Sequence, residues 1–166
     1  LRQGVTIPFL GRRLHHTGDT IEILPAENYI EEILEEHGLT TAKPCTTPGS
    51  STRKTTDGVS QLTPEETTFY RRTTGKLMWL VPRRPDINYA VKELTRALRN
   101  PTEDDQARQR QLLRYLAGTK DYAFEIAPKV NLKDNTTIDI NVFVDSDWCG
   151  CKTTRKSTSG GIIQLF

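Results

Sequence analysis

Apolar and polar residues follow different periods in different parts of the 166-residue chain, and each period predicts a different kind of element. At the start, β-branched and other apolar residues dominate positions 5–10 and 20–24, which predicts the two strands of a hairpin. The stretch between them contains His15, His16 and Gly18, and we expect it to form the connecting turn. The chain should therefore open with a β-hairpin.

The first helical pattern begins after Pro25. Apolar residues at positions 29–34 fall on one stripe and glutamates lie largely outside it, which predicts an amphipathic surface helix. Gly38 stands where a C-terminal cap belongs, so the helix should end there. From residue 40 to 62 no hydrophobic period survives and Thr, Ser, Lys, Pro and Gly dominate, which we interpret as an exposed linker.

Residues 63–120 show the pattern of three helices joined by short connections. Thr63 and Glu66 have the spacing of a capping box, which predicts the start of the first helix. A second helix is expected over 87–98, and a third from a Thr102 cap to Leu116. The apolar face of the first of these helices comprises Phe69, Tyr70, Leu77, Met78, Leu80 and Val81, and we expect Met78 and Trp79 to be core residues.

The last third of the chain changes to strand alternation. A short strand is expected at 122–126 and a loop at 128–135. From Thr137 apolar and polar residues alternate, which places Asp145 at the end of a strand. A second strand begins at Gly160, and the sequence stops within it.

Together these patterns predict an α+β fold with four segments. Residues 1–39 should form the N-terminal β-hairpin and one helix, and residues 40–62 the linker. Residues 63–120 should form a helical region, and residues 121–166 should contain a second β-hairpin.

Composition agrees with a folded protein, since 35% of the residues are hydrophobic and 27% are charged. The apolar runs, such as Leu77–Val81, are far too short to span a bilayer, so no membrane association is expected. No signal-peptide pattern opens the chain and the three cysteines are an odd number, which favours a reduced intracellular compartment. Leu1 is the first residue and Met78 the only methionine, so we expect the chain to begin inside a longer translation product.

The net charge of +2 conceals a basic middle segment, because residues 63–120 carry 12 Lys and Arg against 7 Asp and Glu. Five arginines of this segment could line a groove that follows a phosphate backbone. These are Arg96, Arg99, Arg108, Arg110 and Arg114. Alternatively, the long arginine side chains cover helix surfaces and pair with acidic neighbours such as Glu93 and Asp104. The charge pattern alone leaves both interpretations open.

Asp145 and Asp147 are the strongest chemical candidates, because two carboxylates at the end of a strand can hold Mg²⁺. Spacing alone favours a solvated turn in which Asp147 bonds to the backbone. No Asp or Glu follows Asp147, so the further ligands of a two-metal site cannot come from later in this chain. A zinc site at Cys149 and Cys151 is disfavoured, since only one residue separates them. No nucleophile elbow or Gly-rich phosphate loop is present, which leaves nucleophilic and nucleotide-cradling enzymes without support.

Short motifs spread over most of the chain are together more specific than any one of them. They are Phe9-Leu10-Gly11, Tyr29-Ile30 with Ile33-Leu34, Lys43, Thr47-Pro48, Tyr70-Arg71, Gly75-Lys76-Leu77-Met78-Trp79-Leu80, Arg84-Pro85-Asp86-Ile87-Asn88-Tyr89-Ala90-Val91, Leu113-Arg114-Tyr115-Leu116, Gly118-Thr119, Asp145-Ser146-Asp147-Trp148 and Arg155-Lys156-Ser157-Thr158-Ser159-Gly160. In this order the chain resembles the Pol polyprotein of copia-type LTR retrotransposons, from the end of the reverse transcriptase into the start of the RNase H domain.

The resemblance implies roles for the candidate residues. Asp145 matches the first metal-binding aspartate of RNase H, which cleaves the RNA strand of an RNA–DNA hybrid with Mg²⁺, and Asp147 would be an acidic neighbour. Residues 1–39 would end the palm and thumb region, and residues 63–120 would form the basic thumb and connection. These regions contact primer and template through backbone phosphates in this family, which favours the groove interpretation of the arginines. Residues 121–166 would begin a truncated RNase H-like domain.

The implied partners are an RNA–DNA hybrid or primer–template and the rest of the Pol polyprotein. The implied location is intracellular, either cytoplasmic in a virus-like particle or nuclear. Paired polymerase aspartates are expected before Leu1 and the remaining RNase H carboxylates after Phe166, so the leading hypothesis is a Pol fragment that is inactive alone. The alternatives are a non-catalytic nucleic-acid-binding module, degenerate or domesticated, and a non-functional remnant.

Overall fold

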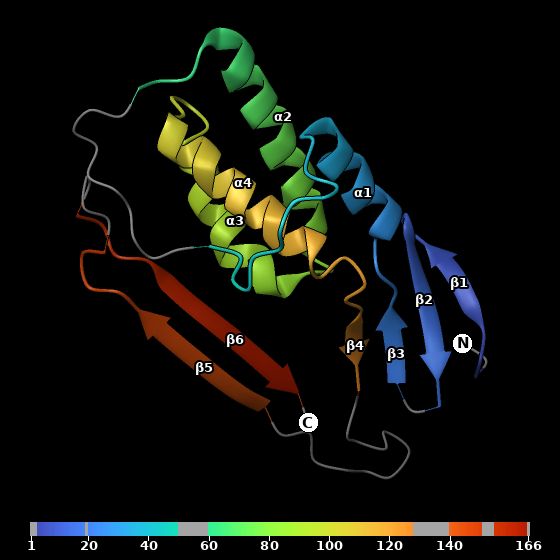
Figure 1. Cartoon of the computed structure of the whole chain (residues 1–166). Helices are drawn as coiled ribbons and strands as arrows, with labels where there is room; N and C mark the ends of the chain where they lie inside the picture. The colour runs from blue at the N-terminus through green and yellow to red at the C-terminus, as the bar shows by residue number, and fades with distance from the viewer. Residues whose placement is uncertain (1–2, 19, 50–59, 128–139, 151–154, 166) are drawn as a thin grey trace.

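The computed structural model describes residues 3–18, 20–49, 60–127, 140–150 and 155–165, and within them the fold is α+β as predicted. The elements in chain order are β1 (Thr6–Phe9), β2 (Arg12–Thr17), β3 (Thr20–Ile23), α1 (Glu27–Glu36), α2 (Pro64–Leu80), the 3₁₀ helix η1 (Pro85–Ile87), α3 (Asn88–Thr95), α4 (Glu103–Ala117), β4 (Phe124–Ile126), β5 (Ile140–Ser146) and β6 (Ser159–Leu165). The helices group together, and the strands form two separate sheets beside them (Figure 1). No helix in the described ranges has the length and apolar character needed to cross a membrane.

The first sheet has the antiparallel order β1-β2-β3-β4. The N-terminal part of the chain contributes three strands to it, one more than predicted. The expectation that His15 and His16 lie in a turn was wrong, because both belong to β2, where they pair with Glu22 and Ile21. The physical reason is a two-residue turn at Leu10 and Gly11, whose φ values of 46° and 71° match a type I′ hairpin turn.

The fourth strand of this sheet comes from far along the chain. β4 pairs with β3, with Ile21 opposite Ile126 and Ile23 opposite Phe124. The sequence pattern grouped this strand with the C-terminal segment, whereas its hydrogen bonds tie it to the N-terminal sheet. The point at which an RNase H-like segment begins stays a prediction.

Local signals place most helix ends correctly. Thr63 and Glu66 form the predicted capping box at the start of α2. Thr102 forms a second one with Asp105 at the start of α4, which gives the buried Asp105 a capping role. Gly38, with φ of 62°, ends α1 as expected for a left-handed C-terminal cap.

The hydrophobic core lies between the helices. Its most deeply buried members are Ile30, Ile33, Tyr70, Leu77, Leu80, Ile87, Leu112, Leu113 and Leu116. Met78 and Trp79 are not core residues as expected, because their side chains are 51% and 44% exposed. On α2 the buried face follows residues 70, 73, 74, 77 and 80, and Met78 and Trp79 lie beside this stripe.

Two threonines of α2 occupy core positions and form hydrogen bonds there. Thr73 and Thr74 are fully buried, and Thr74 Oγ1 accepts a hydrogen bond of 2.9 Å from the side-chain amide of Gln109 on α4. The same amide also donates to the carbonyl of Tyr70 at 3.0 Å. Since a buried polar group must be paired to be tolerated, this network fixes α4 against α2.

The described ends of the segment predicted as a linker lie against the helices. The amide of Cys45 donates to the carbonyl of Arg114, and the amide of Leu62 donates to the carbonyl of Pro101. Leu62 is buried, whereas most of residues 40–49 are exposed. Residues 50–59 lie outside the described residues.

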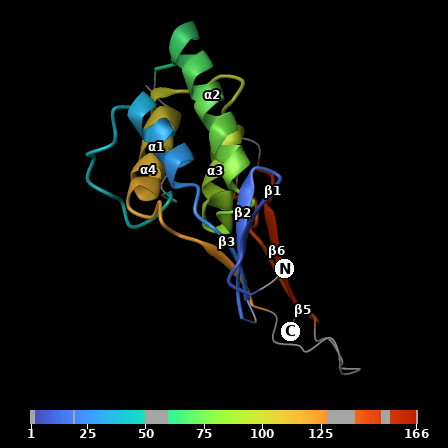
Figure 2. The same cartoon turned by 90° about the vertical axis from the view of Figure 1, so that its right-hand side faces the viewer.

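The second sheet is the isolated hairpin β5–β6, in which Asp145 pairs with Gly160. Its described side chains are mostly exposed, including Val142 at 58% and Ile163 at 70%. One hydrogen bond of 3.0 Å, from Lys92 Nζ to Thr158 Oγ1, joins this hairpin to α3. The predicted loop at 128–135 and the start of the strand predicted from Thr137 lie outside the described residues. Figure 2 shows the helices above and the strands below.

A buried ion pair fixes the turn between α2 and α3. The guanidinium of Arg84 donates from Nε and Nη2 to Asp86 at 3.0 and 2.8 Å, and from Nη1 to the carbonyl of Thr119 at 2.7 Å. Tyr115 also donates to Asp86 from its hydroxyl at 2.8 Å. These bonds join η1 to the C-terminal end of α4, so they hold the helices in register.

We expect Arg84→Met to lower the free energy of unfolding by about 2 to 4 kcal/mol, because it leaves the Asp86 carboxylate without its cation. The expected loss of stability is smaller than for a fully buried ion pair, since the Asp86 side chain is 34% exposed. Urea denaturation measures the change. The matched control is Arg72→Met, whose 3.6 Å ion pair with Glu36 lies at the surface and should contribute about 0 to 1 kcal/mol. Equal losses for the two variants would contradict the structural role of Arg84.

Candidate nucleic-acid interface

The two predicted carboxylates lie at one end of the β5–β6 hairpin. Asp145 is exposed in the last pairs of β5. Asp147 follows the strand, and its carboxylate accepts a hydrogen bond from the backbone N–H of Thr158. The amide of Asp147 also donates to the carbonyl of Thr158 at 3.0 Å. These bonds extend the pairing of the two strands and give Asp147 a structural role.

The described residues alone do not fit a resident Mg²⁺. Within the described ranges, no group of three His, Cys, Asp or Glu side chains could hold a metal ion. An Mg²⁺ bound by one or two carboxylates depends on water and substrate phosphates for its other ligands. The Asp147 carboxylate is moreover engaged by the Thr158 amide. The assignment of Asp145 as a metal ligand therefore stays a prediction.

The five predicted arginines differ in their partners. Arg96 forms an ion pair of 3.3 Å with Glu93 on α3. Arg108 forms one of 3.1 Å with Asp104, one turn earlier on α4. Arg99 is exposed in the turn that follows α3. For Arg96 and Arg108 the structure shows the ion pairs that the alternative interpretation expected.

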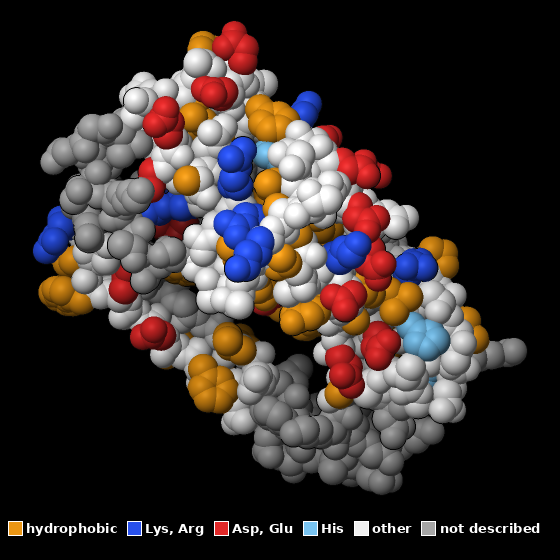
Figure 3. Space-filling view, viewed as in Figure 1, with side chains coloured by type: hydrophobic (Ala, Val, Ile, Leu, Met, Phe, Trp, Pro, Cys, Tyr) orange, Lys and Arg blue, Asp and Glu red, His pale blue; other side chains and the backbone are white. Residues whose placement is uncertain are grey.

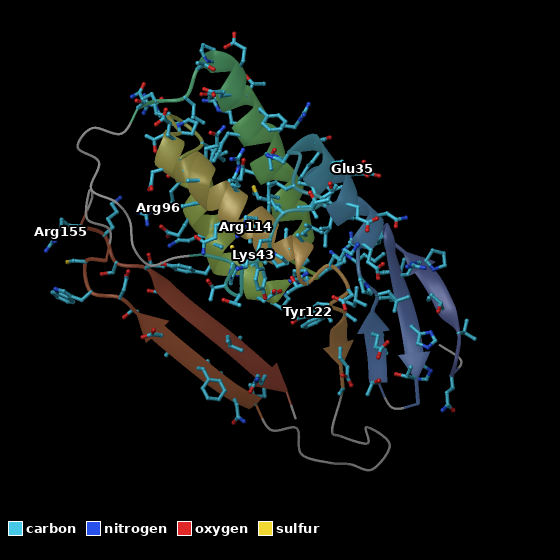
Figure 4. All side chains as sticks on the ribbon, viewed as in Figure 1. Glu35, Lys43, Arg96, Arg114, Tyr122 and Arg155 are labelled. Carbon is cyan, nitrogen blue, oxygen red and sulfur yellow. The ribbon has the colours of Figure 1, made fainter. Side chains whose placement is uncertain are left out.

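Arg110 and Arg114 lie on one face of α4, one turn apart, and a third cation joins them. Arg114 Nε donates a hydrogen bond of 2.7 Å to the carbonyl of Lys43, which brings Lys43 onto this face. Lys and Arg side chains gather there in Figure 3, where Figure 4 labels Arg114 and Lys43. None of the three forms an ion pair with another residue in the part of the chain that the structure describes. We call Lys43, Arg110 and Arg114 the basic face.

The neighbouring helix α1 is rich in acidic side chains, and Figure 4 labels Glu35 on it. Part of this negative charge is compensated locally, because Lys76 Nζ donates to Glu36 at 2.6 Å. The basic face and the outer side of α1 thus carry charge of opposite sign.

Lys43 was missed as a site residue because its segment has no hydrophobic period. The sequence signal that the segment of Lys43 packs against α4 is Gly118, at the end of this helix. A Cβ at Gly118 would lie 2.7 Å from Cβ of Pro44, although the φ of Gly118 is an ordinary −87°. Glycine is thus required here for close approach of residues 43–45 to α4.

His37 is the residue that follows α1. Its Nε2 lies 2.9 Å from Oγ1 of the buried Thr73, and its ring packs on Phe69 with centroids 4.5 Å apart. Burial lowers the pKa of His37, Glu36 raises it, and the charge of Arg110 lowers it further. The neutral imidazole is therefore the form that the fold favours.

The chain is similar in sequence to several plant proteins, two of which are named as retrovirus-related Pol polyproteins. The chain is 35% identical over 144 residues to the Retrovirus-related Pol polyprotein from transposon RE1 of Arabidopsis thaliana, covering 86% of this chain and 9% of that protein. It is 34% identical over 137 residues to the Uncharacterized mitochondrial protein AtMg00810 of the same plant, covering 82% of this chain and 54% of that protein. The Pol polyprotein from transposon TNT 1-94 of Nicotiana tabacum is 31% identical over 143 residues, which cover 82% of this chain and 10% of that protein. No protein-family model and no solved structure matches the chain.

The fold and the surface thus define an α+β chain with a basic helical face. By sequence it belongs with the Pol polyproteins of copia-type retrotransposons, as a homologue of one segment of them. The chain corresponds to about a tenth of the length of the Pol polyproteins that it matches.

We expect the stability that His37 contributes to be present above its unfolded pKa of about 6.5 and to be lost as the pH falls through its lower folded pKa. The unfolded chain takes up the proton first, so protonation favours unfolding. Urea denaturation of the wild type and His37→Gln between pH 8 and pH 5 measures this effect. The stability difference between the two should shrink toward low pH. A difference that is constant across this range would show that His37 is not held neutral by the fold.

Proposed function

We propose that the chain is a nucleic-acid-contacting segment of a retrotransposon Pol polyprotein and that it binds an RNA–DNA hybrid or primer–template through the basic face. The observation that carries this proposal is the convergence of Lys43, Arg110 and Arg114 without ion-pair partners among the described residues. Arg96 and Arg108 already have carboxylate partners, so they contribute less. The remaining partner is the rest of the polyprotein.

The geometry of the basic face suits a phosphate backbone. Arg110 and Arg114 are separated by one helical turn, about 5 to 6 Å, which is close to the spacing of successive phosphates along a strand. Nε of Arg114 is occupied by the Lys43 carbonyl, which holds its guanidinium against α4 and leaves the other nitrogens for a ligand. Binding of this kind reads the backbone and not the base sequence.

The test removes the charge of the basic face. We expect the triple variant Lys43→Gln, Arg110→Gln and Arg114→Gln to bind a fluorescent RNA–DNA hybrid more weakly. We also expect the slope of log affinity against log salt to fall by about 2 to 3, because each lost phosphate contact removes about 0.9. Fluorescence anisotropy at several salt concentrations measures both quantities.

The matched control removes three exposed cations from other elements, with Arg13→Gln, Arg155→Gln and Lys156→Gln. The net charge changes equally, so a general electrostatic effect weakens both triple variants to the same extent. Equal losses would reject the basic face as the site. A wild-type affinity that is absent or independent of salt would reject nucleic-acid binding itself.

We further propose that this chain acts by binding and not by catalysis. Support comes from Asp147, which is bonded to the Thr158 amide, and from Asp145, which has no further carboxylates grouped with it in the described ranges. We expect the purified chain to show no polymerase or RNase H turnover with Mg²⁺. Cleavage of a labelled hybrid above the level of an Asp145→Asn control would contradict this proposal.

The alternative, a domesticated or degenerate binding module, has one observation in its favour. The same segment covers 54% of AtMg00810 and only 9% of a Pol polyprotein, so it also occurs in a much shorter protein. Both proposals share the basic face. They differ in whether the remainder of a Pol polyprotein contributes, so a hybrid affinity that rises when the neighbouring Pol segments are joined to the chain favours the Pol segment, and an unchanged affinity favours the module.

A further inference from the structure

A second arginine next to Arg84 is buried, and two nitrogens of its guanidinium have no hydrogen-bond partner among the described residues. The side chain of Arg83 is only 7% exposed, and its Nε and Nη2 are covered from solvent without an acceptor among the described residues. These two nitrogens form the edge of the guanidinium that binds a carboxylate or phosphate in bidentate fashion. Arg84 uses the same edge to bind Asp86. The corresponding edge of Arg83 has no acceptor among the described residues.

The surroundings hold the Arg83 guanidinium in place. It stacks on the ring of Trp79 with 3.9 Å between Cζ and the ring centroid, and Trp79 in turn packs on Tyr29 with centroids 4.5 Å apart. The β1–β2 turn reaches this ring, because a Cβ at Gly11 would lie 3.8 Å from it. Arg12 follows this turn on β2, so the fold brings a second cation toward Arg83.

The site therefore brings two positive charges together. Burial lowers the pKa of Arg83, and the charge of Arg12 lowers it further. No Asp or Glu forms an ion pair with Arg83 in the ranges that the structure describes. A buried guanidinium in this situation is unfavourable until an anion supplies the acceptors.

We propose that Arg83 and Arg12 form an anion site on the Trp79 platform and that its ligand is a phosphate group of a nucleic-acid backbone. A phosphate offers two or more oxygens, so it can accept from the Nε and Nη2 edge of Arg83 and from Arg12 together. A phosphate reaches this edge only if the segment that covers it moves, and we assign this movement to the exposed turn at Leu10 and Gly11, which lies next to Trp79. The identity of the phosphate source rests on the proposed function, whereas the anion site itself does not.

The first experiment uses inorganic phosphate and the intrinsic fluorescence of the full chain. Trp148→Phe removes the other tryptophan, which is 91% exposed in the C-terminal hairpin, so the emission then reports Trp79 alone. We expect phosphate to change this emission with saturation and to raise the melting temperature. Arg83→Gln should weaken phosphate binding at least 10-fold, and Arg12→Gln about 3- to 10-fold. Acetate at the same ionic strength is the carboxylate probe and should have little effect.

The matched control is Arg13→Gln, which removes an exposed cation from the neighbouring position of β2 and should change phosphate binding less than 2-fold. Equal titrations for Arg83→Gln and Arg13→Gln would overturn the site. Equal effects of acetate and phosphate would overturn the assignment to phosphate. Because Arg12→Gln leaves the buried guanidinium intact, it keeps the test decisive if Arg83→Gln is poorly folded.

The second experiment measures binding of the RNA–DNA hybrid by anisotropy. We expect Arg83→Gln to lower the affinity about 5- to 10-fold, and Arg13→Gln less than 2-fold. Unchanged hybrid binding by Arg83→Gln overturns the nucleic-acid source of the phosphate but not the function of the basic face. If no variant and no wild type binds the hybrid, the proposed function fails, and an Arg83-dependent response to inorganic phosphate still establishes the anion site.

Discussion

The helical part of this chain depends on one buried guanidinium. Arg84 forms hydrogen bonds to Asp86 and to Thr119, and Asp86 also accepts from Tyr115, so one network connects the turn after α2 with the end of α4. The Arg84 side chain is only 5% exposed, so its guanidinium depends on these protein acceptors. The Arg-Pro-Asp motif and the Gly-Thr pair thus have a structural explanation, and neither needs a role in chemistry. Because this network and the Gln109 network both fix α4, they also fix the position of the basic face.

The two basic sites illustrate how burial decides what an arginine can do. Arg96 and Arg108 have exposed or half-buried ion pairs, which contribute little and are exchanged readily. Arg110 and Arg114 form no ion pair with another residue in the described ranges, and Arg114 donates to the Lys43 carbonyl instead. Arg83 is the extreme case, since its buried edge has no acceptor among the residues that the structure describes. A count of arginines in the sequence cannot distinguish these three situations.

Helix boundaries and fold class could be predicted from the sequence because their signals are local. Thr63 with Glu66 and the positive φ of Gly38 act within one turn of the chain. The second strand could not be predicted, because its His-His pair resembles a turn and a leucine holds one of the φ > 0 positions of the preceding hairpin. The exposure of Trp79 and the position of Lys43 depend on packing between segments far apart in sequence. The pairing of β4 with β3 is non-local for the same reason. What the arginines bind, and whether Asp145 ever holds a metal ion, stay predictions.

The pairing of β3 with β4 has a mechanical consequence. Strand β3 leads into the helices and β4 leads out of them, and adjacent strands lie about 4.8 Å apart. The hundred or so residues between them, with the basic face, therefore leave the sheet and return to it on neighbouring strands. The distance between the two ends of the helical segment is thus set by strand pairing and does not depend on the length of chain between them.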